Sequence, residues 1–261
     1  MTHRERFIKV LKGETVDRIP FISTFLIEEE ILTLWEEQGL KNSRKWKECL
    51  GFEGPKRGWI GTSVNQGICP AFKSEVLEEN ENYILERDTI GRVIKRKRGG
   101  PYYLRICVEY PVKDRNDWEC LKTERLNPNY EGRFPKNWHT LVGEYKNRDY
   151  PLALGGTGYG LYGTARNLLG DERLLTSFYL DKKLVLDIMN YITDMWISIW
   201  SKMAEVVNFD IIEMWEDMAS NDSSLISPDT FREFMLPCYR KISRFAEEHN
   251  IPIVMLIAME T

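Results

Sequence analysis

The sequence predicts an α/β protein with a parallel sheet and an antiparallel insertion. Short apolar runs near residues 20, 59, 152, 211 and 253 are typical of strands, and amphipathic helical patterns separate the later runs, as in successive β/α units. Between the second and third runs, residues 72–110 alternate apolar and polar side chains around turn residues, which indicates antiparallel hairpins. The chain has 261 residues, 43% of them hydrophobic, and can therefore bury the core of one large domain. We treat residues 1–261 as that domain, with an insertion at 72–110.

Composition excludes several classes of function. A net charge of -4 argues against a nucleic-acid binder, which normally carries a basic excess, and favours a small-molecule ligand. No apolar run approaches the roughly 18 to 20 residues of a membrane span, and the N-terminus lacks a signal peptide's apolar core, so we expect a cytoplasmic protein that does not bind membranes. The five cysteines are widely spaced, with no CxxC pair and no nearby histidine. They indicate reduced thiols and no metal site.

The N-terminal part predicts short helices and strands. Thr2 and Glu5 form a capping box that opens a helix ending before Gly13. The pattern then predicts a turn that leads into a short strand within 17–22, helices at 28–38 and 43–50, and a strand at 58–61.

The insertion alternates in residues 74–78, 83–88 and 93–98, and residues 102–108 are consistent with a further strand. Its basic cluster at 95–98 favours a solvated hairpin face over an anion site, because several glutamates lie close in sequence. Helices are expected after Asp114, a good N-cap, and at 135–145.

A glycine-rich turn follows the buried strand predicted at 151–155. Gly158, Gly160 and Gly163 match G-x-G-x-x-G literally, between a strand and a helix. A dinucleotide site also needs a second strand ending in an acid about 20 residues later, whereas residues 174–206 are helical almost throughout. We therefore expect these glycines to let the backbone approach a ligand or a packed helix.

The strand predicted at 209–215 carries the candidate catalytic residues. It follows the longest predicted helix, which Asp181 caps and whose apolar stripe we assign to the core. Glu216 and Asp217 come directly after the strand, where catalytic side chains of α/β proteins are placed. The alternative is that these acids are helix caps or ion-pair partners. Ser227 then caps a helix that Pro237 should kink, and a strand is predicted at 251–254.

Four segments, at residues 4–20, 150–155, 215–219 and 226–237, resemble the uroporphyrinogen decarboxylase superfamily, which also contains cobalamin-dependent methyltransferases. The resemblance implies a TIM-like (β/α)8 barrel with a ligand cleft at the carboxyl ends of its strands. It implies that Glu216 or Asp217 orients substrate or handles a proton, while Tyr159, Tyr162 and Arg166 line the cleft. Members of the superfamily are longer by roughly two or three β/α units, so the barrel is expected to be incomplete at its C-terminus.

Departures from the superfamily favour one branch. Residues 21–26 lack the arginine of the decarboxylases, residues 58–61 lack their aspartate, and residues 253–256 lack the His-x-Cys of the zinc-binding thiol methylases. The resemblance therefore implies corrinoid-linked methyl transfer to or from a small molecule. Porphyrinogen decarboxylation in tetrapyrrole biosynthesis and an inactive truncated fragment are the alternatives. A methylcobamide is expected as a substrate and not as a tightly bound cofactor, and a corrinoid protein or a second copy of the chain are the partners left open.

We also hypothesise that a frameshift near Val254 shortened the barrel. Residues 255–261 can be encoded so that the shifted frame reads Val-Asp-Ser-Asp-Gly-Asn, which is similar to the superfamily's strand. The nucleotide sequence of the gene tests this hypothesis.

Overall fold

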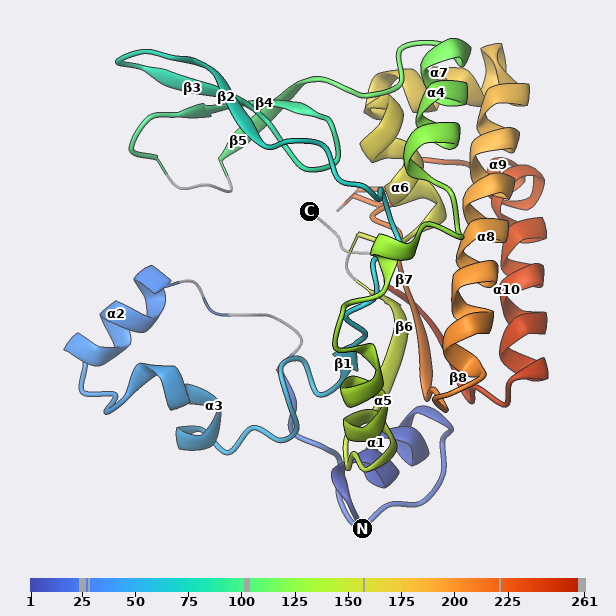
Figure 1. Cartoon of the computed structure of the whole chain (residues 1–261). Coiled ribbons are helices and arrows are strands. Elements are labelled where there is room, and N and C mark those ends of the chain that lie inside the picture. The colour runs from blue at the N-terminus through green and yellow to red at the C-terminus, as the bar shows by residue number, and fades with distance from the viewer. Residues whose placement is uncertain (24–26, 28, 101–103, 157, 221, 258–261) are drawn as a thin grey trace.

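The computed structural model describes residues 1–23, 27, 29–100, 104–156, 158–220 and 222–257. Its strands form two sheets (Figure 1). The parallel sheet has the order β1-β6-β7-β8, and the antiparallel sheet has the order β2-β3-β4-β5. The strands are β1 (Ile60–Gly61), β2 (Glu75–Glu79), β3 (Tyr83–Arg87), β4 (Val93–Lys97), β5 (Arg105–Glu109), β6 (Leu152–Gly156), β7 (Ile211–Trp215) and β8 (Ile253–Ile257).

Four helices begin where the sequence predicts caps. Thr2 closes a capping box, and the side chains of Asp114, Asp181 and Ser227 each accept a backbone hydrogen bond at a helix start. The helical segments are α1 (His3–Leu11), α2 (Glu29–Glu37), η1 (Ser43–Lys45), α3 (Trp46–Cys49), α4 (Arg115–Arg125), η2 (Glu131–Arg133), α5 (Trp138–Lys146), α6 (Leu161–Leu169), α7 (Asp171–Leu180), α8 (Lys182–Ala204), α9 (Pro228–Thr230), η3 (Phe231–Met235) and α10 (Leu236–Glu248). In the part of the chain that the structure describes, none of these helices is long and apolar enough to cross a membrane.

The predicted strand at 17–22 is wrong. The described residues there form no strand, and the Ile19 side chain is exposed. Pro20 has no N–H to donate, and Phe21 bonds to Glu53 by one backbone N–H and one carbonyl instead of pairing with a neighbouring strand. By contrast, the predicted insertion is confirmed as the antiparallel sheet. The beginnings of the strand predicted at 102–108 and of the helix predicted at 28–38, and the end of the proposed frameshifted segment, 258–261, lie outside the described residues.

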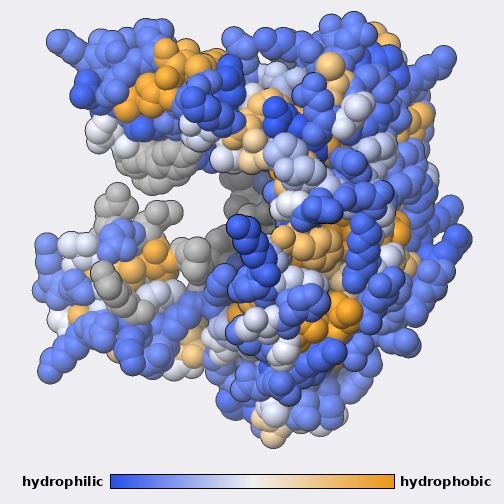
Figure 2. Space-filling view, viewed as in Figure 1, coloured by the Kyte–Doolittle hydropathy of each residue, from blue (hydrophilic) through white to orange (hydrophobic). Residues whose placement is uncertain are grey.

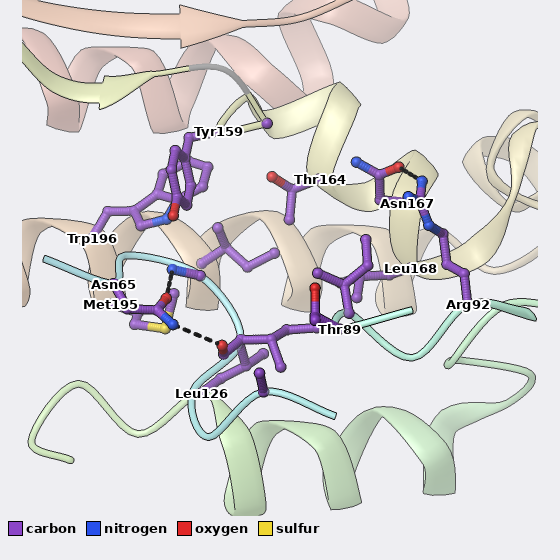
Figure 3. A pocket seen from close by; sticks show the side chains of 16 residues that line it. Asn65, Thr89, Arg92, Leu126, Tyr159, Thr164, Asn167, Leu168, Met195 and Trp196 are labelled. Carbon is purple, nitrogen blue, oxygen red and sulfur yellow. Dashed lines mark hydrogen bonds between the residues drawn. The ribbon is translucent and has the colours of Figure 1, made fainter. Parts of the chain in front are cut away.

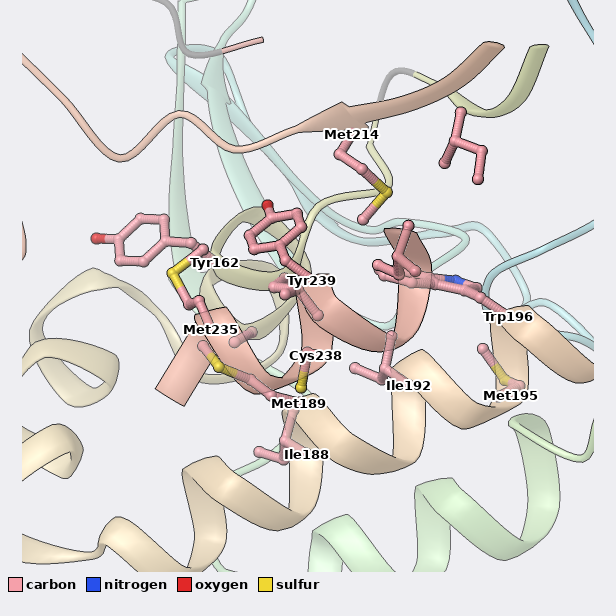
Figure 4. Close-up of a cluster of buried hydrophobic side chains, with 14 of the residues drawn as sticks. Tyr162, Ile188, Met189, Ile192, Met195, Trp196, Met214, Met235, Cys238 and Tyr239 are labelled. Atoms are coloured by element: carbon pink, nitrogen blue, oxygen red, sulfur yellow. The ribbon is translucent and has the colours of Figure 1, made fainter. Parts of the chain in front are cut away.

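The main core lies between the parallel sheet and its helices. Leu154 of β6 and Met214 of β7 point to this side and are fully buried. The apolar stripe of α8 packs there against η3 and α10, as Figure 4 shows for Ile188, Ile192 and their neighbours. The stripe is therefore core, as predicted.

The other face of the parallel sheet is organised differently. Trp59, Ala153 and Ile211 pack there with Phe7 of α1, and the β8 side chains beside them are only partly buried. The arm formed by α2 and α3 and the hairpins of the antiparallel sheet extend away from α8 and α10 (Figure 1), whereas the turn at 88–92 of that sheet reaches α6. Figure 2 shows a hollow between the antiparallel sheet and the arm. We call this side of the parallel sheet the open face.

The predicted α/β class with a parallel sheet and an antiparallel insertion is confirmed. The four parallel strands follow one another in chain order with helices packed on one side, as consecutive units of a barrel would. A closed (β/α)8 barrel is not formed by the strands in the described residues.

Candidate functional site

Glu216 holds the start of α6. Its side chain is fully buried, and its two carboxylate oxygens accept hydrogen bonds from the backbone N–H groups of Leu161 and Tyr162, both at 2.8 Å. The Tyr239 hydroxyl donates a further hydrogen bond to the same carboxylate. Burial raises the pKa of Glu216 to about 7, against the opposing effect of the backbone donors. The structure thus places this predicted catalytic residue as a helix cap, which was the alternative considered for it.

Asp217 lies at the rim of the sheet. Arg166 donates to the Asp217 carboxylate at 3.1 Å and to its backbone carbonyl at 3.3 Å, so two predicted site residues are brought together. The backbone φ of Asp217 is 43°, an uncommon value outside glycine that directs the side chain out of the strand. Its second carboxylate oxygen, Oδ1, accepts no hydrogen bond from any described residue. This oxygen is itself buried, although the Asp217 side chain as a whole is 22% exposed.

The two predicted tyrosines occupy different surroundings. Tyr162 is fully buried beside Met235 (Figure 4), and burial raises the pKa of its hydroxyl to about 12. It belongs to the core between α6 and η3. Tyr159 lines a cavity on the helix side of the sheet (Figure 3). Their predicted roles at a substrate cleft remain predictions.

The glycine-rich turn packs directly on the end of β7. A Cβ atom on Gly160 would lie 1.9 Å from the Trp215 carbonyl oxygen, and one on Gly163 would lie 2.8 Å from the same oxygen. Only hydrogen atoms fit at these two positions. The sequence predicts that these glycines approach a ligand or a packed helix; in the structure this pair approaches the end of a strand, β7, and the close approach brings α6 to Glu216.

A buried ion pair on the open face is not among the predicted site residues. Glu213, in the middle of β7, is 2% exposed. One of its oxygens accepts from Arg57 at 2.6 Å and the other from the Trp59 indole N–H at 2.6 Å. The Arg57 guanidinium lies over the rings of Trp59 and Trp215, 4.6 and 5.0 Å from their centroids.

The position of Glu213 carried a usable signal. In the run Ile211–Trp215 it is the one charged residue of a strand that is otherwise apolar. An acid in such a strand is buried and needs a partner, which is a reason to search the chain for a cation. Because side chains alternate along a strand, Ile211, Glu213 and Trp215 share the open face.

The titratable groups of the described residues show no arrangement typical of a metal centre. Within the described ranges, no three His, Cys, Asp or Glu side chains are placed to hold a metal ion together. Cys69 and Cys238 are buried thiols, and burial raises the pKa of each.

Comparison with known proteins gives one structural relative. No family model and no curated protein sequence matches the chain. A solved structure of a methyltransferase from Methanosarcina mazei is similar, with a TM-score of 0.52 and 18% sequence identity over 99% of this chain and 70% of that one. At this level of identity the similarity shows a shared fold.

Proposed function

We propose that the protein transfers a methyl group between a small molecule and a corrinoid, with the reaction at the open face and its rim. The observation that carries the proposal is the Glu213–Arg57 pair, which is held between two tryptophans on the sheet face opposite the main core. The fold shared with a methyltransferase supports the same reading. Barrel-type folds place their chemistry at the carboxyl ends of the strands, and Trp215, Glu216 and Asp217 lie at such an end.

Each group has a distinct part in this proposal. Trp215, which is partly exposed, offers an apolar surface to a large planar substrate such as a corrinoid, while Glu213 and the buried Trp59 hold the Arg57 guanidinium against it. At the rim, the partly exposed Asp217 carboxylate accepts a proton from the second substrate, while Arg166 fixes the carboxylate.

Glu216 acts as a positioning residue in this proposal. Its carboxylate fixes the first turn of α6, and α6 carries Arg166 to Asp217. The fully buried carboxylate reaches no substrate itself.

Porphyrinogen decarboxylation has weaker support. Its tetra-acid substrate requires cations that are not already neutralised. Arg57 pairs with Glu213, Arg166 pairs with Asp217, and the chain carries a net charge of -4.

The proposal is tested with methylcob(III)alamin as methyl donor. Purified protein is incubated without oxygen with this donor and a panel of thiols, phenols and amines as acceptors. Loss of the methylcobalamin absorbance and the mass of the methylated acceptor are the two readouts. We expect Asp217→Asn to lower the rate about 100-fold, because it removes a group that accepts a proton.

A matched control uses another aspartate in an ion pair. Asp229 pairs with Arg232 on the surface, so Asp229→Asn should leave the rate unchanged. No methyl loss with any acceptor would contradict the proposal, and consumption of uroporphyrinogen by the same sample would favour decarboxylation.

A further inference from the structure

We infer that the protein has a second small-molecule site, on the helix side of the sheet, which binds a neutral aromatic molecule that carries one carbonyl or hydroxyl oxygen. A cavity of about 410 Å³ lies between α6, α8, the loop at 65–71 and the turn at 88–92 of the antiparallel sheet (Figure 3). Its residues include neither the Glu213–Arg57 pair nor Asp217. The site therefore does not depend on the proposed methyl transfer.

The walls of the cavity are mainly apolar and include aromatic rings. The ring of Tyr159 meets that of Trp196 edge-on, with 6.3 Å between the centroids. Beside them stands the flexible thioether of Met195, which makes favourable contacts with aromatic rings. The other apolar lining includes Ile68, Leu126 and Ile192. An aromatic ring is the chemistry that such walls favour.

The Thr164 hydroxyl is the group that points to a ligand. It is buried and has no hydrogen-bond partner among the described residues. Threonines in helices usually bond to the carbonyl four residues earlier, as Thr193 does with Met189 at 2.7 Å and Thr123 does with Glu119 at 2.8 Å. Thr164 makes no such bond, although its helix provides the Gly160 carbonyl. Leaving a buried hydroxyl without a partner costs stability, and a ligand oxygen would remove that cost.

Asn167 supplies a second polar group, one helical turn further along the same side of α6. Its side-chain oxygen accepts a hydrogen bond from Arg92 at 2.6 Å, so its amide nitrogen faces the other way, toward Thr164 (Figure 3). The Thr164 hydroxyl and the Asn167 amide N–H are thus two donors on the α6 wall of the cavity. An acceptor oxygen on the ligand can pair with the Thr164 hydroxyl.

Charge decides between a neutral and an anionic ligand. Arg92 lines the cavity, but its guanidinium is held by Asp88 at 2.8 Å and by Asn167. The pair contributes no net charge to attract a carboxylate. We therefore expect a neutral ligand.

The test compares acetophenone with benzoate, which has a similar size and shape but carries a negative charge. Binding is measured by saturation-transfer NMR and by titration, with no corrinoid present, so the result is independent of the proposed function. We expect acetophenone to bind and benzoate to bind at least tenfold more weakly.

Two variants locate the binding. Thr164→Val removes the hydroxyl and should weaken acetophenone binding about tenfold. It should also raise the melting temperature of the free protein, because it removes an unsatisfied buried group. Thr123→Val, in which the lost hydroxyl bonds within its own helix, should leave binding unchanged. Ala71→Trp fills the cavity from an exposed position and should abolish binding.

Three results would overturn the inference. They are no binding of acetophenone, equal binding of benzoate, or equal affinities in the Thr164→Val and Thr123→Val proteins. If Thr164→Val does not fold, the Ala71→Trp protein decides, and unchanged binding there rejects the site.

Discussion

Replacing Gly160 by alanine should unfold much of the protein at moderate urea concentrations. The backbone of Gly160 has φ -147° and ψ 155°, which alanine adopts freely, so the effect is steric alone. The new Cβ would lie 1.9 Å from the Trp215 carbonyl oxygen, whereas such contacts are essentially never under 3.0 Å. The start of α6 would have to move away from β7 by about 1 Å.

That movement determines the magnitude. The two backbone hydrogen bonds to Glu216, each 2.8 Å long, would lengthen beyond useful range. Above pH 7, where the Glu216 carboxylate is ionised, hydrogen bonds to this charged group contribute about 1.5 to 3 kcal/mol each, so the expected loss is about 3 to 6 kcal/mol in the free energy of unfolding. This is a large part of the roughly 5 to 15 kcal/mol that stabilises a typical domain.

Urea unfolding followed by circular dichroism measures the loss. Gly143→Ala is the control: Gly143 lies within α5, nothing stands within 4 Å of its Cβ position, and alanine there should add about 0.5 to 1 kcal/mol. If the free energies of unfolding of the Gly160→Ala protein and the unsubstituted protein differ by less than 1 kcal/mol, the turn can accommodate a Cβ atom at this position. The glycine would then serve some other purpose, such as the approach of a ligand.

Two further predictions concern the buried charges. The pKa of Glu216 is raised from an ordinary 4.5 to about 7 in the folded state, so as the pH rises the unfolded state loses this proton first. The free energy of unfolding should therefore fall between pH 5 and pH 7.5, by at most about 3 kcal/mol. Urea titrations across this pH range should show the decrease in the free energy of unfolding, and the Glu216→Gln protein, which cannot ionise at this position, should not show it. An equal pH dependence in both proteins would contradict the raised pKa of Glu216. On the open face, Arg57→Lys keeps the positive charge but loses the planar contact with the two tryptophans, and should slow methyl transfer about tenfold. An unchanged methyl-transfer rate in the Arg57→Lys protein would mean that only the positive charge matters, and would contradict a role for the planar contact.

Local features were predictable from the sequence and long-range pairings were not. The caps at Asp114 and Ser227 depend on residues three positions away, so the sequence pattern contains both partners. The strand expected at 17–22 depended on a neighbouring strand that no local pattern can supply. In the same way, the sequence shows that Glu213 is an acid within an apolar strand, but it does not identify the partner Arg57, which lies 156 residues earlier. Pairing across that distance is a property of the folded sheet.

The two adjacent acids after β7 therefore do different work, and this can be separated experimentally. Glu216 is fully buried and holds α6, whereas the Asp217 side chain is 22% exposed and pairs with Arg166 at the rim. The Glu216→Gln side chain has a single oxygen for two backbone donors, so the loss of one hydrogen bond should lower the free energy of unfolding by about 1 to 3 kcal/mol at pH 7.5. Removing a buried charge offsets part of this loss. Asp217→Asn should change the free energy of unfolding by less than about 0.5 kcal/mol, because a partly exposed ion pair contributes little to stability. The same substitution should lower the methyl-transfer rate. The decisive comparison is the ratio of rate loss to stability loss in the two proteins. Equal ratios would mean that the acids act as one structural unit, and the assignment of Asp217 to the reaction would have to be withdrawn.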